Sequence, residues 1–393
     1  MFPFLSDLIN YLFGFSFSFP LPMFGFMVAL AFIAANLLFV QEMKRKEADG
    51  LLSADTIKVI KGKKASVNEL LSNGLFGFVI GFKLGGIILN YAQAAEDLQS
   101  YVMSLEGNLL SGIVLAAVLA YLKYREAEKN RLPEPKEVTE VVRPYQHVGN
   151  MTFIAAIGGI LGAKLFDAVE DLERLMDDPI GVILSGSGLS IYGGLIIGGG
   201  AVVYYAHKKG LKLVHVIDAC APGLMLAYGI GRIGCQLSGD GDWGTTNELP
   251  IPEALSFLPD WMWSFTYPHN VNGEGILIAA CEGNYCEELC RKGYCYALEA
   301  PVWPTPFYET VMAFMIFGGL WAFRKKITTP GVMFSFYLIF NGIERFLIEK
   351  IRINPDYNIL GMKATQAEII AVLLVIVGIG GIWYAKKSYK GAT

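Results

Sequence analysis

Long apolar stretches separated by short polar segments dominate the chain. Leu21 to Val40 runs twenty residues without a charged side chain, and eight further stretches have a similar character. A helix of about 20 residues crosses a hydrocarbon core of about 30 Å, so the pattern predicts nine transmembrane helices. Their predicted bounds are 21–41, 75–93, 107–124, 149–168, 180–206, 213–236, 306–324, 330–349 and 367–385.

The composition supports the same fold class. Of the 393 residues, 53% are hydrophobic and 17% are charged, and this balance is too apolar for a soluble protein. We therefore expect an all-α polytopic membrane protein, with residues 1–393 forming a single membrane domain. The net charge of -4 offers no broad basic surface, so nucleic acid is not an expected partner.

Basic residues mark the predicted orientation. They follow the first, third, fifth, seventh and ninth apolar stretches, as in Lys44-Arg45-Lys46 and Lys386-Lys387, whereas the alternate connections are poor in Lys and Arg. The positive-inside rule then predicts an N-terminus outside and a C-terminus in the cytoplasm. The first twenty residues lack a basic region, so we expect a retained first helix and no cleaved signal peptide.

The connection 239–303 carries four of the six cysteines, and the predicted orientation makes it an extracytoplasmic loop. In that oxidising space the cysteines favour two disulfides. A zinc site is the weaker alternative, because the spacings contain no C-x-x-C pair. The pairing stays open at this stage. The clustered cysteines are Cys281, Cys286, Cys290 and Cys295.

The first part of the chain has a different organisation. Residues 125–147 are charged and contain prolines, so we predict a cytoplasmic linker without a hydrophobic core. The segments Gly81-Phe-Lys83-Leu84 and Gly162-Ala-Lys164-Leu165 lie at matching depths of two predicted helices. This match hints at internal similarity.

Ionisable residues within the predicted helices are candidates for function, because a charge inside a bilayer is costly. The candidates are Lys83, Lys164, Asp218, Arg232, Glu344, Arg345 and Glu349. The two arginines suit an anionic lipid headgroup, since a guanidinium can hold a phosphate through two hydrogen bonds. We predict that both face one cavity that binds an anionic lipid.

Each candidate segment also has a structural interpretation. Arg232 stands among glycines that can expose backbone amides to an anion or simply pack helices, with the arginine reaching the membrane surface. Arg345 and Glu349 are four residues apart and can form an ordinary interfacial ion pair, with Arg352 one turn further. Tyr192, in the glycine-rich segment that begins at Gly186, can be an aromatic-belt residue.

Together these segments resemble the prolipoprotein diacylglyceryl transferase family. The resemblance rests on Gly231-Arg-Ile-Gly234, Gly193-Gly-Leu-Ile196, Tyr308-Glu309 and Arg345-Phe-x-x-Glu349, with Asp218-Ala-Cys-Ala-Pro222 upstream of the first. It covers a transferase core at 149–385 and, more faintly, the first helix. Residues 43–147 are then an extra two-helix insertion with its cytoplasmic linker.

The resemblance implies an enzyme that transfers a diacylglyceryl group from phosphatidylglycerol to the lipobox cysteine of prolipoproteins. The expected site lies on the periplasmic side of the bacterial inner membrane and needs no cofactor or metal. Arg232 and Arg345 would bind the phosphate, with Glu349 and Asp240 orienting them. The implied catalytic residues are Tyr192, Arg232, Arg345 and Glu349, and the implied substrate-binding residues are Gly193, Gly194, Gly231, Gly234, Cys235, Asp240, Tyr308, Glu309 and Arg352.

Three positions depart from the family pattern. Tyr192 stands where the family has a histidine, Cys235 where asparagine is common, and Phe24 where an early tyrosine is usual. A thiol with a pKa of about 8.5 supplies some thiolate unaided, and a nearby arginine supplies more. Tyr192 is the hypothetical group that positions or deprotonates the thiol.

Two other functions fit parts of the pattern. Glycine-broken helices with intramembrane charges also occur in transporters of small anionic or lipid substrates, but here the charges gather toward one side. The missing histidine also fits a relative that binds lipoprotein precursors without modifying them.

Overall fold

The computed structural model describes residues 1–15, 17–91, 98–184, 190–281, 283–354, 356–359 and 362–389. The chain divides into two compact units. The first unit comprises Met1–Leu52 with Ala206–Thr393, and the second comprises Ser53–Tyr205. Each unit is described by itself.

Six helical segments of the described chain are long and apolar enough to cross a membrane. They confirm the prediction of a polytopic helical membrane protein. Two more helices, α6 (Leu109–Lys129) and α14 (Val332–Glu349), coincide with predicted spans, and α10 (Ile191–Lys208) covers the later part of the predicted span 180–206. The total of nine crossings stays a prediction. The six are α2 (Met23–Ala48), α3 (Val67–Leu89), Pro144–Glu170, which joins η1 to α7 (Val148–Glu170), α11 (Leu213–Ser238), α13 (Thr305–Phe323) and α15 (Gln366–Ser388).

The predicted span 180–206 is wrong as one continuous helix. Helix α9 (Pro179–Leu184) ends early, Ser190 is not helical, and α10 begins at Ile191. The glycines Gly186 and Gly188 of this segment lie outside the described residues. Helix α8 (Leu172–Asp177) precedes α9.

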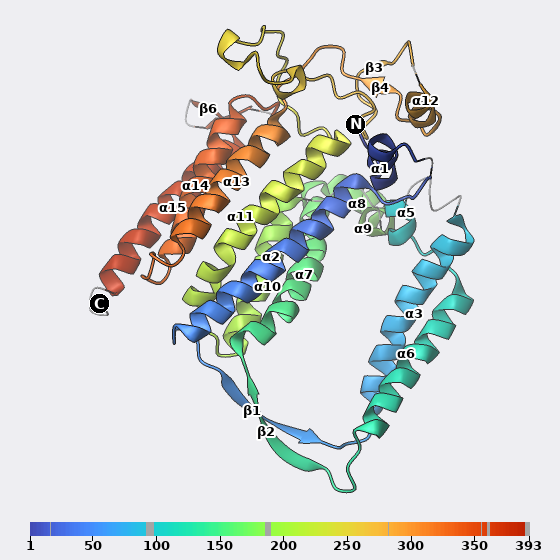
Figure 1. Cartoon of the computed structure of the whole chain (residues 1–393), viewed down its shortest axis with the longest axis vertical. Coiled ribbons are helices and arrows are strands. Elements are labelled where there is room, and N and C mark those ends of the chain that lie inside the picture. The colour runs from blue at the N-terminus through green and yellow to red at the C-terminus, as the bar shows by residue number, and fades with distance from the viewer. Residues whose placement is uncertain are drawn as a thin grey trace. The chain divides into compact units, whose positions relative to one another are not determined.

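The predicted linker 125–147 contains a strand that the sequence did not predict, and its partner strand lies earlier in the chain. Strand β1 (Asp55–Lys61) pairs antiparallel with β2 (Lys136–Val142), with Asp55 opposite Val142 (Figure 1). The strand faces are largely exposed, so the ribbon forms without a core of its own.

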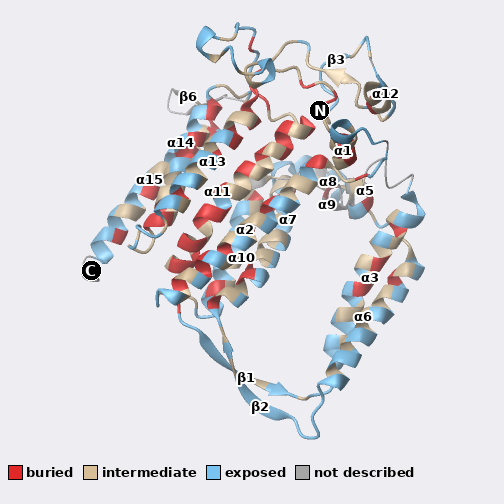
Figure 2. Cartoon of the chain, in the orientation of Figure 1, coloured by how far each residue is buried: buried red, intermediate tan, exposed pale blue. Residues whose placement is uncertain are grey.

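Helix α11 is the centre of the first unit. It packs against α2 and α13, while α14 packs against α13 and α15. Buried positions recur from one end of α11 to the other (Figure 2), as expected for a helix that other helices surround. A core cluster joins α11, α13 and α14 through Ala221, Met225, Ala313, Leu320 and Met333.

Asp218 has a structural role in this unit. Its carboxylate accepts hydrogen bonds from the backbone amides of Gly331 at 2.7 Å and Phe334 at 2.9 Å. These amides belong to the first turn of α14, where helical N–H groups lack intrahelical partners. An acidic residue of α11 thus caps α14 from a neighbouring helix, which explains a buried carboxylate far from the arginines.

The long loop between α11 and α13 is held by two disulfides, Cys281–Cys286 and Cys290–Cys295. Helix α12 (Asn284–Arg291) supplies one cysteine to each disulfide, Cys286 and Cys290, and Lys292 pairs at 3.3 Å with Asp7 of α1 (Leu5–Phe13). The disulfide prediction is therefore confirmed. The remaining short elements of the first unit are η2 (Glu253–Leu255), η3 (Asp260–Met262), β3 (Ile276–Leu277), β4 (Tyr296–Ala297), β5 (Asp356–Ile359) and β6 (Met362–Thr365).

Two helical hairpins make up most of the second unit. In the first, α3 packs against α6, with the short helix α5 (Leu98–Met103) between them in sequence. In the second, α7 contacts α10 where a Cβ on Gly193 would come within 2.2 Å of the Gly162 carbonyl oxygen. Both hairpins therefore rely on glycine for close backbone contact.

Candidate functional site

Arg232 is the centre of a buried polar cluster in the first unit. Its position near the end of α11 points the guanidinium at α13, where its Nε lies 2.6 Å from Oε2 of Glu309. The Glu309 side chain is fully buried. Nη1 of Arg232 also pairs with Asp242, which follows α11 in the loop. The guanidinium lies 5.2 Å from the ring centroid of Tyr228, one helical turn earlier.

Arg352 binds the same two carboxylates from the end of α14. Its Nη2 pairs with Asp242, and its Nη1 lies 3.4 Å from Oε1 of Glu309. Two guanidinium groups are thus bridged by two carboxylates. Arg232 lies on α11 and Glu309 on α13, while Asp242 follows α11 and Arg352 follows α14. The packing of these three helices therefore brings the cluster together.

The loop fixes Asp242 in this position. Gly239 ends α11 with a φ of 66°, a left-handed conformation that glycine adopts without strain. The chain then turns back, and Thr305 donates a hydrogen bond of 2.6 Å to the Asp242 carbonyl. Burial raises the pKa of the Asp242 carboxyl, but the charges of Arg232 and Arg352 outweigh burial and hold the pKa below its usual value. Asp242 is therefore a carboxylate at neutral pH.

Tyr228 and Glu344 extend the cluster. The Tyr228 hydroxyl donates to Oε2 of Glu309 and lies 3.4 Å from Oε1 of Glu344. Glu344 is 2% exposed, and its Oε2 has no hydrogen-bond partner in the described structure. A buried oxygen in that state is costly. Glu344 thus brings an unsatisfied acceptor to the edge of the cluster.

The structure pairs Arg345 with a different carboxylate. Its Nη2 lies 3.1 Å from Oε2 of Glu349, although the angle does not make a hydrogen bond. Oε1 of Glu349 accepts a 2.6 Å hydrogen bond from Asn354. Among the described residues, Arg352 and not Arg345 shares carboxylates with Arg232. The link between the two predicted arginines is Glu344, which interacts with the charges of both.

Asp242 occupies the place that the sequence analysis gave to Asp240. The Asp240 carboxylate contacts the Cys235 thiol and accepts a 3.4 Å hydrogen bond from the Asp242 amide, and burial raises the pKa of the Asp240 carboxyl. Cys235 lies 3.7 Å from Nη1 of Arg232. The two acidic residues alternate along a short loop, so the sequence could not show which one turns toward the arginines.

The remaining predicted residues of the first unit have mixed surroundings. A Cβ on Gly234 would meet Met27 of α2 at 3.0 Å, which makes Gly234 a packing residue, whereas nothing lies within 4 Å of a Cβ on Gly231. Tyr308 donates a 2.8 Å hydrogen bond to the carbonyl of Met262 and so ties the loop to α13.

Tyr192, Gly193 and Gly194 belong to the second unit. Tyr192 is half-buried in the first turn of α10. Gly193 faces the Gly162 carbonyl, and a Cβ on Gly194 would lie 3.1 Å from the Gly159 carbonyl. The two glycines therefore allow α10 to contact α7, and the approach of Tyr192 to the arginines stays a prediction.

Tyr228 was not predicted, Glu344 was left outside the implied site, and of the acidic pair Asp240 and Asp242 only Asp240 was assigned to it. Tyr228 is four residues before Arg232, a spacing that places both on one helix face. This spacing was the available signal for Tyr228. The signal for Asp242 was its place in the acidic pair that follows Arg232.

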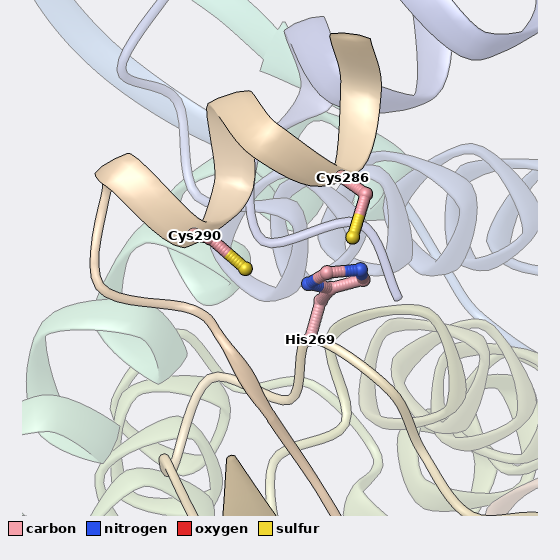
Figure 3. Close-up of side chains that lie close together, drawn as sticks. All are labelled: His269, Cys286 and Cys290. Carbon is pink, nitrogen blue, oxygen red and sulfur yellow. The ribbon is translucent and has the colours of Figure 1, made fainter. Parts of the chain in front are cut away.

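Two groups of side chains have the residue types of metal ligands. His269, Cys286 and Cys290 lie together in the loop (Figure 3), with ligand atoms within 4.8 Å of one another. Both sulfurs are in disulfides, and thiolates are what zinc requires. The second group is Cys235, Asp240 and Asp242, where two guanidinium groups already neutralise Asp242. Neither group suits a metal ion in this state.

Comparisons with known proteins place this cluster in context. A sequence model of the family described as "Prolipoprotein diacylglyceryl transferase" matches residues 108–384. A phosphatidylglycerol–prolipoprotein diacylglyceryl transferase of Clostridium tetani is 28% identical over 233 residues, which cover 59% of this chain and 78% of the relative. One from Corynebacterium efficiens is 27% identical over 276 residues, covering 68% of this chain and 74% of the relative. A second enzyme of that name from Clostridium perfringens is 27% identical over 243 residues, covering 62% and 79%.

Proposed function

The chain belongs to the prolipoprotein diacylglyceryl transferase family, and on this premise we propose that it transfers the diacylglyceryl group of phosphatidylglycerol to a cysteine thiol of prolipoproteins. The observation that carries the proposal from the structure is the buried pair of guanidinium groups, Arg232 and Arg352, held by Asp242 and Glu309. The family match disfavours the transporter and the non-catalytic relative.

The chemistry explains why arginines are needed. The cysteine thiolate attacks the glyceryl carbon that is bonded to the phosphate oxygen. A carbon–sulfur bond forms, the carbon–oxygen bond breaks, and the oxygen keeps the electron pair. The leaving glycerol phosphate gains one negative charge, so positive groups at the phosphate stabilise the transition state more than the bound lipid.

The arginines have hydrogen-bond donors left for this charge. In the part of the chain that the structure describes, Arg232 uses Nε and Nη1 for Glu309, Asp242 and Cys235. Its Nη2 donors remain for an anion. The carboxylates hold the guanidinium in place before the substrate arrives, which lowers the cost of reorganisation during the reaction.

The orientation of the site follows from the charge pattern. Basic clusters after alternate helices favour an N-terminus outside and a C-terminus in the cytoplasm. The disulfide-bonded loop and Asp242 then lie on the extracytoplasmic side. We therefore place the active site at the outer leaflet of a bacterial cytoplasmic membrane, where lipoprotein precursors emerge.

The direct test uses purified protein, phosphatidylglycerol vesicles and a lipobox peptide. Mass spectrometry should find the peptide heavier by one diacylglyceryl group. Arg232→Lys should lower kcat/KM by at least about a hundredfold, because a point charge does not reproduce the planar contacts of a guanidinium. A wild-type protein without transfer would contradict the function, and a lysine variant within about threefold of wild type would contradict the role of Arg232.

Tyr192 is proposed to position or deprotonate the incoming thiol. Tyr192→Phe removes only the hydroxyl and should lower kcat by about ten to a hundredfold, while Tyr192→His should retain transfer, because histidine is the family's usual residue. The measurement is the initial rate of peptide modification at saturating lipid. Full activity of the phenylalanine variant would remove Tyr192 from the reaction.

A further inference from the structure

The two hairpins of the second unit share one layout. Strand β1 begins at Asp55 and β2 at Lys136, a shift of 81 positions (136 − 55). The same shift relates both ends of α3 (Val67–Leu89) to both ends of α7 (Val148–Glu170). It also relates both ends of α5 (Leu98–Met103) to both ends of α9 (Pro179–Leu184). Three elements therefore repeat in the same order at one spacing.

Glycines in corresponding positions make corresponding contacts. Gly81 and Gly162 are related by the shift, and a Cβ on either would meet a carbonyl oxygen of the following long helix, at 2.5 Å and 2.3 Å. Gly77 and Gly158 are related in the same way, and each faces backbone of that helix, Leu115 O at 2.6 Å and Gly198 Cα at 3.2 Å. The two hairpins thus close by the same mechanism.

The residue just before the second long helix of each hairpin, α6 or α10, makes a corresponding hydrogen bond to the first long helix. The amide of Asn108 donates to the Phe82 carbonyl at 2.8 Å, and the amide of Ser190 donates to the Ala163 carbonyl at 3.1 Å. Phe82 and Ala163 are related by the shift. In the second hairpin the Ser190 hydroxyl also donates to Glu170 at 2.9 Å. Tyr192 follows two residues later.

A lysine in each hairpin binds the short helix. Lys83 Nζ donates to the carbonyls of Tyr101 at 2.9 Å, Ser104 at 2.5 Å and Glu106 at 2.7 Å. Lys164 Nζ donates to the carbonyl of Val182 at 3.3 Å. Tyr101 and Val182 are related by the shift, and each lies in the last turn of its short helix. Carbonyls there lack intrahelical donors and attract a cation.

We propose that residues 53–133 and 134–214 are two copies of one duplicated structural unit, and that Lys164 is a positioning residue that holds α9 on α7 and thereby places Tyr192 for thiol transfer. The family match contains the whole second copy and starts at residue 108, late in the first. In the second long helix the equivalent contacts lie 82 positions apart, since α6 begins at Leu109 and α10 at Ile191. Leu110 therefore stands where the second copy has Tyr192, and Ser111 where it has Gly193. The first copy therefore keeps the scaffold and lacks the phenol.

The role of Lys164 rests on the proposed function of Tyr192, whereas the duplication does not. The first copy supplies a matched control, since Lys83 makes the same kind of contact in a hairpin without the tyrosine. Lys164→Met and Lys83→Met remove equivalent ammonium groups. Lys164→Arg keeps a cation that can donate to carbonyls.

Two measurements on the full chain in lipid nanodiscs test the proposal. Hydrogen exchange should accelerate in α9 only for Lys164→Met and in α5 only for Lys83→Met, because each short helix loses its cationic contact. Transfer to the lipobox peptide should fall about tenfold in kcat for Lys164→Met with KM for lipid nearly unchanged, stay near wild type for Lys83→Met, and recover in Lys164→Arg.

The outcomes distinguish the duplication from the positioning role of Lys164. Equal loss of transfer in both methionine variants, or unchanged exchange in both, would overturn the inference. An active Lys164→Met protein with a loosened α9 would overturn the positioning role. If the exchange pattern appears but the wild-type protein transfers no lipid, the duplication stands and the proposed function fails. Should Lys164→Met not accumulate, Lys164→Gln gives the same comparison.

Discussion

Buried charges in this protein fall into two kinds according to what they contact. Asp218 satisfies backbone amides at the start of α14, so its charge stabilises the packing of two helices. Arg232 and Arg352 instead bind the fully buried carboxylate of Glu309 and the half-buried carboxylate of Asp242, next to an unsatisfied oxygen of Glu344. A buried ion pair contributes little net stability, so the anion binding that we propose explains a cluster of this kind better than stability does.

Asp242 and Asp240 should respond to substitution in opposite ways. Asp242→Asn leaves two guanidinium groups short of a charged partner and should destabilise the fold by about 3 kcal/mol. Asp240→Asn removes a carboxylate whose burial is unfavourable and should leave the melting temperature unchanged or raise it. Thermal unfolding in detergent at pH 7 measures both. A lower melting temperature for Asp240→Asn than for Asp242→Asn would contradict the assignment.

The pH dependence of these variants follows from the direction of each shift. The folded-state pKa of Asp242 is below its unfolded value of 3.8, so its stabilisation is complete above that value and is lost as the pH falls through the folded pKa. The folded-state pKa of Asp240 is raised, so its cost is relieved as the pH falls through that pKa. Any advantage of Asp240→Asn should therefore shrink toward pH 4.

The sequence indicated the ion pair between Arg345 and Glu349, which the structure contains, but not the carboxylates that Arg232 shares with Arg352. Arg232, Glu309 and Arg352 were identified because charges in apolar helices and family motifs mark them. Their shared contacts depend on how α13 and α14 pack beside α11, which no local pattern encodes. Asp242 reaches the site only because the chain reverses after Gly239, and Tyr228 is distinguished from other helix tyrosines only by its neighbours.

At the scale of elements, glycine decides which helices can touch. A Cβ on Gly342 of α14 would lie 2.6 Å from the Ala371 carbonyl of α15, just as Gly193 of α10 meets α7. In a membrane, small residues allow such close approach, and packing takes the place of the hydrophobic effect. Apolar stretches predicted where helices lie, but the break between α9 and α10 and the pairing of β1 with β2 needed three-dimensional contacts.

Gly193 and Gly200 provide a matched pair within α10. Gly193→Ala places a methyl group against the Gly162 carbonyl and should destabilise the protein by about 1–3 kcal/mol. Gly200→Ala enters open space, where no atom lies within 4 Å, and should cause no loss. The melting temperatures of the two variants in one detergent give the comparison. Equal values would show that α7 and α10 are not in close contact.

At the scale of the whole molecule, we propose that residues 53–133, the first copy of the duplicated unit, are an addition to the family core. In the proposed duplication the ends of this copy, residues 53 and 133, correspond to residues 134 and 214. Removal of one copy deletes two predicted membrane crossings, so the orientation of all later helices is preserved.

Deletion of residues 53–133 should therefore give a protein that inserts and transfers lipid. We expect about half or more of the wild-type rate, because Lys164, Tyr192 and the arginine cluster are all retained, while β2 loses its partner strand and some stability with it. Peptide modification in vesicles measures the rate. A deletion protein that inserts but is inactive would show that the first copy contributes to the reaction.

The contact between Asp218 and the start of α14 limits how the length of this helix can vary in evolution. Along α11, Asp218 lies about 21 Å from Arg232, and along α14, Phe334 lies about 22 Å from Glu349, at 1.5 Å per residue. Both distances are measured from the contact between the Asp218 carboxylate and the first turn of α14. A single-residue insertion within α14 would shift its far end by about 1.5 Å and rotate it by about 100°, carrying Arg352 away from Asp242. Homologues that keep the anchor and the cluster should therefore tolerate substitutions in this segment but not changes in its residue count.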